Sequence, residues 1–380
     1  MFKYPVVNDL AKLGDNRAQV TAIEAKVEAR LMKKGMIEDY NKEMQGYLER
    51  GTFREISEDE MREWKGAVNY ISHHDVPKPS SKSTKLRIVS NSSLPNNNGG
   101  LSYNDCLPKG PNSLIPLIEA LAAWRQYPRV VTWDYSKCYN SVYTTERELH
   151  CRRFVWRFSQ SECWKVYGID RMHFGDKPAA IGLDVAKHLV AAAGREIDPA
   201  AAGMIERDYV DDGFGGGDED DVLRLMGEIE DENGDRKYRG TVPTIMEKGG
   251  FYIKYMVRDG ESRPGILEQF SGAVLGVPWD TEKDNIKMQF TVNLSPKVQK
   301  VHQGDPVKLE QVCELDGAKL TKRIMLSQIY SIYNPLGLLS PIAGLTSRSV
   351  VILQALRNHG EGLVIEGLTP SKSRGKPESR

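Results

Sequence analysis

The chain has 380 residues, of which 40% are hydrophobic and 27% charged, and its 52 basic and 52 acidic residues give a formal net charge of zero. This is globular composition with enough apolar residues for a sizeable core, and the length suits two or three lobes better than one compact domain. A net charge of zero excludes a small, strongly basic nucleic-acid binder, so contacts with nucleic acid would need local basic patches.

Cysteine usage and hydropathy predict the cellular setting. The five cysteines form no CxxC pair and no spacing typical of a metal site, which is typical of free thiols in a reducing compartment. No stretch is as long and apolar as a membrane span, and the N-terminus lacks the apolar core of a signal peptide. We therefore expect an intracellular, cytoplasmic protein without a membrane partner.

The first fifty residues are predicted to form two helices. Apolar residues recur at helical spacing over 20–31, with Asp15 as the expected cap, and Gly35 ends this helix. A second helix runs from there to Gly51. Both are expected to pack in the core and not to carry a site.

After these helices the pattern changes to short strands. Residues 70–77 and 85–89 are predicted as two strands, joined by a tip over 78–84 that is rich in Pro, Ser and Lys. Basic residues gather between 76 and 130. Each one alone is typical of a solvated surface charge, but their segregation along the chain favours nucleic-acid binding. They are Lys78, Lys82, Lys85, Arg87, Lys109, Arg125 and Arg129.

The middle of the chain is predicted to alternate between helices and buried strands. An amphipathic helix over 114–124 leads into a strand over 129–134. A second helix covers 178–193, with Asp176 as a candidate N-cap, and a second strand covers 204–210.

Each of these two strands is expected to end in carboxylates: Asp134 closes the first, and Asp211 and Asp212 follow the second. Carboxylates at a strand end are costly to desolvate unless they bind a cation or face water in a turn. Phosphoryl-transfer enzymes use such carboxylates to hold two divalent ions about 4 Å apart, and magnesium suits this arrangement. The YVDD tetrapeptide alone is more typical of an exposed acidic turn; the acid on a second strand is what favours a metal site.

Longer strings resemble one family, the reverse transcriptases of Bel/Pao retrotransposons. TKLRIV at 84–89 and LSYNDCLPKGP at 101–111 resemble the fingers segment of these enzymes. The resemblance runs from about residue 15 to 356, nearly the whole chain. Its further strings are KGGF at 248–251, LGVPW at 275–279, TKR at 321–323 and YNPLGLLSP at 333–341.

The resemblance implies an α+β right-hand polymerase fold, with fingers, a palm of antiparallel sheet and packed helices, and a thumb-like helical region. N-terminal helices and fingers would cover 1–120, and the palm would cover 121–285, interleaved with fingers around 145–175. A thumb-like or connection region would cover 286–365. The composition of 366–380, rich in Ser, Lys, Arg, Gly and Pro, predicts a disordered tail.

The implied activity is RNA-directed DNA polymerisation, in which a primer 3′-hydroxyl attacks the α-phosphate of a deoxynucleoside triphosphate and pyrophosphate leaves. Asp134 and Asp211 would bridge two Mg²⁺ ions, for which Mn²⁺ can substitute, and Asp212 would support the metal site. The partners would be deoxynucleoside triphosphates and a primed RNA or DNA template, which is read by base pairing. Full-length polyproteins of such elements also carry protease, ribonuclease H and integrase, so fusion to these is expected.

On the nucleotide side the resemblance implies four contacts. Arg87 would bind the triphosphate, because a guanidinium fork suits phosphate oxygens. Tyr139, five positions after Asp134, would pack under the sugar and exclude a 2′-hydroxyl, although such a residue is also typical of an ordinary core. Phe174 and Gly175 would lie beside the nascent base pair.

The chain also departs from the family pattern. Asn91 stands where the family usually has Asp, the segment 174–178 is shorter than the family's form, and an insert lies around 231–240. None of these departures removes an expected metal ligand. Two alternatives stay open: a catalytically inactive, retroelement-derived nucleic-acid-binding protein or fragment, and an acidic metal-binding protein that uses the carboxylates of 208–221 without polymerisation.

Overall fold

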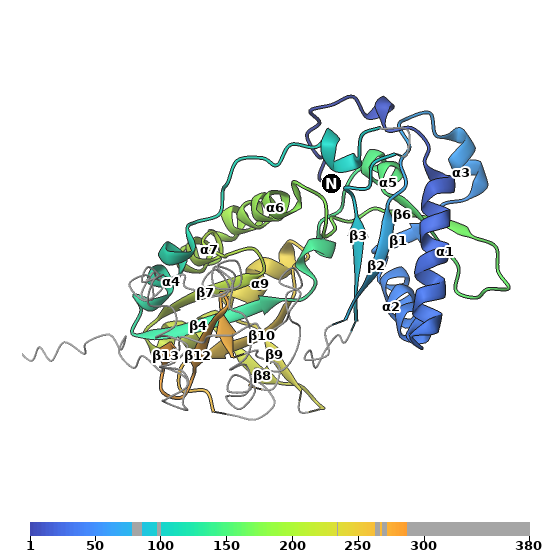
Figure 1. Ribbon diagram of the computed structural model, residues 1–380. Coiled ribbons are helices and arrows are strands. Elements are labelled where there is room, and N and C mark those ends of the chain that lie inside the picture. The colour runs from blue at the N-terminus through green and yellow to red at the C-terminus, as the bar shows by residue number, and fades with distance from the viewer. Residues whose placement is uncertain (78–85, 97–99, 234, 263–266, 268–271, 287–380) are drawn as a thin grey trace, which may run out of the picture. The chain divides into compact units, whose positions relative to one another are not determined.

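A computed structural model describes residues 1–77, 86–96, 100–233, 235–262, 267 and 272–286 of the chain (Figure 1). This part is α+β, as predicted, with helices and several small antiparallel sheets. The expected strand tip at 78–84, the thumb-like region beyond Ile286 and the C-terminal tail lie outside the described residues. Within the described ranges, no helix combines the length and the apolar character that crossing a bilayer requires.

The chain forms two compact units, each assembled from three separate segments. The predicted domain boundaries at residues 120 and 285 stay predictions. Unit 1 contains Met1–Leu114, Tyr135–Glu206 and Glu228–Lys254, and unit 2 contains Ile115–Asp134, Arg207–Gly227 and the chain from Tyr255 onward.

The two N-terminal helices of unit 1 confirm the helical spacing in the sequence. They are α1 (Arg17–Lys33) and α2 (Ile37–Glu49). Asp15 is not the N-cap of α1, although its carboxylate accepts a hydrogen bond from the Arg17 N–H at 2.9 Å. Asn16 holds the N-cap position, and its side-chain amide exchanges two hydrogen bonds with the backbone of Tyr70, at 2.7 and 2.8 Å. The start of α1 is thereby fixed to the segment that leads into the next strand.

Unit 1 contains two small antiparallel sheets next to these helices. The predicted strand pair is confirmed as β2 (Ser72–Pro77) and β3 (Leu86–Asn91), which pair along their whole length. A second sheet has the order β1–β6–β5, with β1 at Phe53–Glu55, β6 at Lys165–Ile169 and β5 at Arg153–Trp156.

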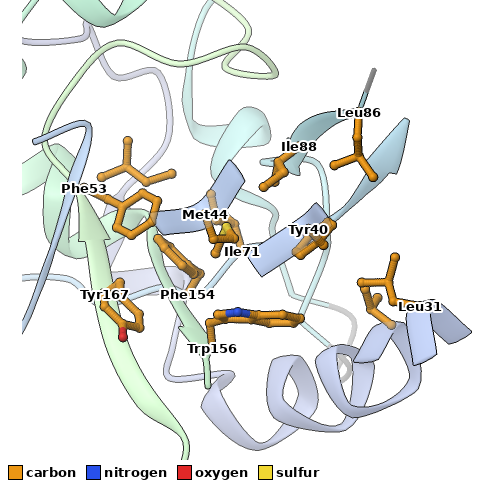
Figure 2. Close-up of a cluster of buried hydrophobic side chains, with 12 residues drawn as sticks. Leu31, Tyr40, Met44, Phe53, Ile71, Leu86, Ile88, Phe154, Trp156 and Tyr167 are labelled. Carbon is orange, nitrogen blue, oxygen red and sulfur yellow. The ribbon is translucent and has the colours of Figure 1, made fainter. Parts of the chain in front are cut away.

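The main core of unit 1 forms where both helices meet both sheets, and its aromatic rings interlock (Figure 2). The rings of Phe53 and Phe154 meet edge to face with centroids 4.9 Å apart, and those of Tyr40 and Trp156 lie 5.1 Å apart. Aromatic pairs stabilise beyond the burial of their area: the first pair joins β1 to β5, and the second connects α2 to β5 of the same sheet.

In unit 1, α7 (Pro199–Ile205) and α9 (Thr241–Lys248) pack against the long helix α6 (Ala179–Gly194). Gly194 is the last residue of α6, and a Cβ there would lie 2.4 Å from Ile245 Cγ2, so the glycine lets α6 and α9 approach closely. Unit 1 also contains α3 (Glu58–Glu63), α5 (Glu146–Cys151) and the hairpin of β8 (Glu228–Glu230) and β9 (Arg236–Tyr238).

The prediction that Asp176 caps α6 is wrong. The N-cap position belongs to Pro178, and no side chain caps the helix. The Asp176 carboxylate is instead buried and paired with Arg152 at 2.7 Å. A buried guanidinium is a stronger partner for a carboxylate than helix N–H groups that water can also satisfy.

Unit 2 contains most of the sheet that carries the acidic residues; only Tyr135, Ile253 and Lys254 of its strands are assigned to unit 1. Its strand order is β10–β4–β7, with β4 at Arg129–Tyr135, β7 at Asp212–Gly217 and β10 at Ile253–Arg258. Two helices, α4 (Leu117–Arg125) and α8 (Glu219–Met226), and the short strands β11 (Ala273–Val274), β12 (Val277–Asp280) and β13 (Asn285–Ile286) complete its described part. The rings of Trp124 and Trp279 meet edge to face at 4.9 Å in its core.

The prediction of a strand over 204–210 is wrong. Residues 204 and 205 end α7, and the strand begins only at Asp212, after the acids and not before them. The Asp198 side chain accepts hydrogen bonds from two N–H groups of the first turn of α7, and Pro199 occupies a first-turn position. These start signals and the alanines that follow outweigh the strand preference of the later apolar residues.

Candidate metal and nucleotide sites

The register of β4 and β7 brings two of the predicted metal ligands together. Asp134 and Asp212 are direct partners in this antiparallel pair, followed by Trp133 with Gly213. Side chains at directly opposed positions leave the sheet on the same face, with Cβ atoms about 4.5–5.5 Å apart. Both aspartates are partly buried, so two carboxylates from different strands share one face at the end of this pair.

Asp211 lies at the tip of a tight hairpin that leads into β7. Tyr209 and Asp212 exchange both backbone hydrogen bonds, at 2.8 and 3.0 Å, so that only Val210 and Asp211 form the loop. Val210 has φ +56°, a conformation that is rare for a β-branched residue and that type II′ hairpin turns require at this position. Such strain costs about 1–3 kcal/mol and is often found at functional sites. The turn leaves Asp211 exposed next to Asp212.

Tyr255 on β10 lies close enough to all three carboxylates for each of them to affect its pKa. Burial, followed by the negative charges of Asp134, Asp212 and Asp211, raises the pKa of the Tyr255 hydroxyl well above its usual value. This tyrosine was not singled out from the sequence because no motif surrounds it; only its place on the third strand relates it to the acids. Oxygen ligands on one face, with one of them exposed, fit the chemistry that Mg²⁺ prefers.

Among the described residues, a separate group consists of Glu60, Glu146 and His150. The side-chain atoms that could bind a metal in this group all lie within 4.8 Å of one another. It does not fit a metal. His150 Nδ1 accepts a hydrogen bond from Arg153 Nε at 3.1 Å, so the other ring nitrogen carries the hydrogen and has no lone pair to offer. Both carboxylate oxygens of Glu60 accept from Arg54, at 2.6 and 2.7 Å.

The predicted nucleotide-side residues form one group within unit 1. The rings of Tyr139 and Phe174 lie 4.5 Å apart with an interplanar angle of 49°. The Arg87 guanidinium lies over the Phe174 ring, 5.8 Å from its centroid, in a cation–π contact. Tyr139 is buried, whereas Arg87 is exposed and Phe174 is 37% exposed. Three residues that are distant in sequence thus present a cation and an aromatic face together.

Gly175 joins this group through its backbone. Its φ is +106°, and a Cβ at this position would lie 2.6 Å from the carbonyl oxygen of Ser90 on β3. Only glycine combines this conformation with so close an approach. The segment that carries Phe174 is therefore pressed against the strand that carries Arg87.

Two further cations near this group were not predicted. Lys137 is left-handed, with φ +52°, and precedes the short 3-10 helix Cys138–Ser141 that contains Tyr139. Burial, and then the positive charge of Arg50, lowers the pKa of Lys137. The Arg50 guanidinium lies over the Tyr47 ring at 5.0 Å. Neither cation belongs to a motif; the position of Lys137 between Asp134 and Tyr139 was the available signal.

The metal-ligand candidates therefore gather in unit 2 and the nucleotide-side candidates in unit 1, with Tyr139 following Asp134 by five positions in the chain. Neither models of known protein families nor the curated proteins contain a match to this chain. The resemblance to Bel/Pao reverse transcriptases accordingly stays a prediction that depends on the residues themselves.

Proposed function

We propose that this chain is an RNA-directed DNA polymerase with a right-hand polymerase fold of the Bel/Pao type. The observation that carries this proposal is the pairing of Asp134 with Asp212 on adjacent strands, with Asp211 exposed at the hairpin tip beside them. Carboxylates that lie on one sheet face, on two strands held by backbone hydrogen bonds, supply the rigid oxygen ligands that phosphoryl transfer requires.

In the proposed reaction Asp134 and Asp211 would hold two Mg²⁺ ions, and Asp212 would support the site. Ions held there would supply activation of the primer 3′-hydroxyl and stabilisation of the negative charge on the leaving pyrophosphate. The protein fixes the carboxylates before the substrate arrives, so little reorganisation is needed during the transfer. Mn²⁺ can substitute because it also binds oxygen ligands.

The group in unit 1 would bind the incoming nucleotide. Arg87 offers a guanidinium fork to the triphosphate, and its contact with Phe174 restricts the orientation of the guanidinium. Tyr139 would lie under the sugar and exclude a 2′-hydroxyl. Phe174 and Gly175 would contact the nascent base pair. The template would be read by base pairing, so the protein itself needs only backbone contacts and a shaped pocket.

Primer extension on a primed homopolymer RNA template with Mg²⁺ tests this proposal. Asp211→Asn should lower incorporation by more than about 100-fold, because the ions supply several kcal/mol of transition-state stabilisation. Asp220→Asn is the matched control: it neutralises an exposed acid nearby in the sequence, on α8, and should leave incorporation within about twofold of the parent. A folded, template-binding parent without incorporation would contradict the proposal and favour a retained fold without catalysis.

A further inference from the structure

A fully buried arginine, Arg152, lies in the interior of unit 1. The side chain of Arg152 has 0% exposure, and each of its five N–H groups donates a hydrogen bond. A guanidinium has five such donors, so none is left unsatisfied. The acceptors are the carbonyl oxygens of Glu148, Ile169 and Arg171, the hydroxyl of Thr144 and the carboxylate of Asp176.

Asp176 is the charged partner in this network, and its side chain is only 1% exposed. One carboxylate oxygen accepts from Arg152 at 2.7 Å and from the Tyr4 hydroxyl at 3.1 Å. The other accepts from the Ser92 hydroxyl at 2.6 Å. A buried pair that is satisfied on both sides favours one arrangement strongly, because removing either partner leaves an uncompensated buried charge.

The backbone on both sides of Asp176 is held as well. Asn104 donates to the carbonyl oxygen of Gly175 at 2.8 Å and accepts from the N–H of Lys177 at 2.8 Å. Gly175 in turn lies against Ser90, with no space for a Cβ. The residue that precedes this fixed turn is Phe174, whose ring contacts both Tyr139 and Arg87.

We propose that the buried Arg152–Asp176 pair is a positioning device that holds Phe174 and Gly175 in place for nucleotide binding. The nucleotide part of this inference depends on the proposed function. The carboxylate of Asp176 turns into the interior and does not cap α6. Its hydrogen bond from Ser92 anchors the shortened 174–178 segment to the end of β3. Both members of the pair are positioning residues, since they act through Phe174 and Gly175.

Hydrogen exchange of the full-length chain tests the positioning without requiring activity. Asp176→Asn keeps the size of the side chain but removes its charge, and should speed exchange of the Lys177 amide and its neighbours by at least about tenfold, as expected for local opening. Ser92→Ala removes one bond to the same carboxylate and should act in the same direction more weakly, which covers the case in which the first variant does not fold.

Glu28→Gln is the control for general loss of stability. It weakens another carboxylate–arginine pair of unit 1, in which Arg157 donates to Glu28 at 2.8 and 3.0 Å, and it should leave exchange around Lys177 unchanged. Unchanged exchange in both Asp176→Asn and Ser92→Ala would overturn the inference.

Steady-state kinetics test the link to the nucleotide. Asp176→Asn should raise KM for the deoxynucleotide by about 10- to 100-fold with kcat changed much less, because a shift of about 1 Å in a positioning group has effects of this size. When Asp176→Asn is combined with Phe174→Ala, it should raise KM little beyond the value for Phe174→Ala alone, because the pair acts through the Phe174 ring. Faster exchange with an unchanged KM would overturn the nucleotide role. An inactive parent would contradict the proposed function, and the exchange result would still decide whether the pair positions the segment.

Discussion

Trp133 and Gly213 illustrate how single residues fix the place of the acids. They are partners in the β4–β7 register, directly beside the pair of Asp134 and Asp212. A Cβ on residue 213 would lie 1.8 Å from Trp133 Nε1, so the indole fills the space that a side chain would need. The glycine therefore allows the two strands to pair closely where the carboxylates meet.

This contact predicts that Gly213→Ala destabilises the protein by about 1–3 kcal/mol, the usual cost of overpacking. Urea unfolding of the full chain measures the change. Gly203→Ala is the control, because a Cβ at this position of α7 meets nothing within 4 Å, and it should stabilise by up to about 1 kcal/mol. Equal stability of Gly213→Ala and the parent would refute the steric argument.

Tyr139 gives a second prediction at the residue scale. Its ring is buried against Phe174, where the proposed polymerase would place the sugar of the nucleotide. Tyr139→Ala should reduce discrimination against ribonucleotides by at least about tenfold, as removal of a steric contact in a pocket commonly does. Tyr139→Phe keeps the ring and should discriminate like the parent. Competition between deoxynucleotides and ribonucleotides in primer extension measures both, and equal discrimination by the two variants would count against a sugar gate.

At the scale of elements, α1 and β2 are joined by a buried acid–imidazole contact. Glu24 is fully buried; one of its carboxylate oxygens accepts from the backbone N–H of His73 at 2.9 Å, and the other lies 3.4 Å from Nδ1 of the His73 ring. Burial raises the pKa of Glu24 to about 8, against the opposing effects of the His73 N–H and the Arg30 charge. Burial also lowers the pKa of His73 to about 3. The folded state thus favours an uncharged pair between helix and strand.

The raised pKa of Glu24 predicts how stability depends on pH. The folded chain keeps a proton that the unfolded chain releases near pH 4.5, so this contribution is present at low pH and is lost as the pH rises through about 8. Relative to Glu24→Gln, the parent should lose stability on the order of 4 kcal/mol between these pH values. Urea unfolding at a series of pH values measures the difference. Glu38→Gln, an exposed position on α2, should show no such trend, and a constant difference for Glu24→Gln would contradict the prediction.

Elements with strong local signals could be predicted from the sequence, and those that depend on distant partners could not. The apolar spacing of α1 and α2 and the dense apolar run of β4 decide their structure locally. The strand β7 is Asp-Gly-Phe-Gly-Gly-Gly, with almost no strand preference, and it forms because Trp133 and Tyr127 occupy the space above its glycines.

In the candidate site, too, local signals could be predicted from the sequence and long-range contacts could not. Asp134, Asp211 and Asp212 could be proposed from their positions, but their pairing across two strands comes from the β4–β7 register. Asp176 was predicted as a cap because a local motif suggested it, whereas its actual partner, Arg152, lies 24 residues earlier in the chain. Long-range partners of a charged residue leave no pattern in a single sequence.

At the scale of the whole molecule, each unit combines segments that are far apart in the chain, and each gathers one kind of chemistry. Unit 2 holds the carboxylates on β4 and β7, and unit 1 holds the cations and aromatic rings around Phe174. The proposed polymerisation would require both groups of residues. An acidic metal-binding protein that uses only the 208–221 segment would require neither Asp134 nor the group in unit 1.

The proposed mechanism requires acids from two strands to serve one metal site. Titration of Mn²⁺ against the parent and Asp134→Asn, followed by electron paramagnetic resonance of the free ion, tests it most directly. Loss of an outer-shell partner alone commonly weakens a metal site about 10- to 100-fold, so loss of a direct ligand should weaken binding at least about tenfold. Affinity in Asp134→Asn equal to that of the parent would contradict this mechanism and assign the cation to the acidic 208–221 segment alone.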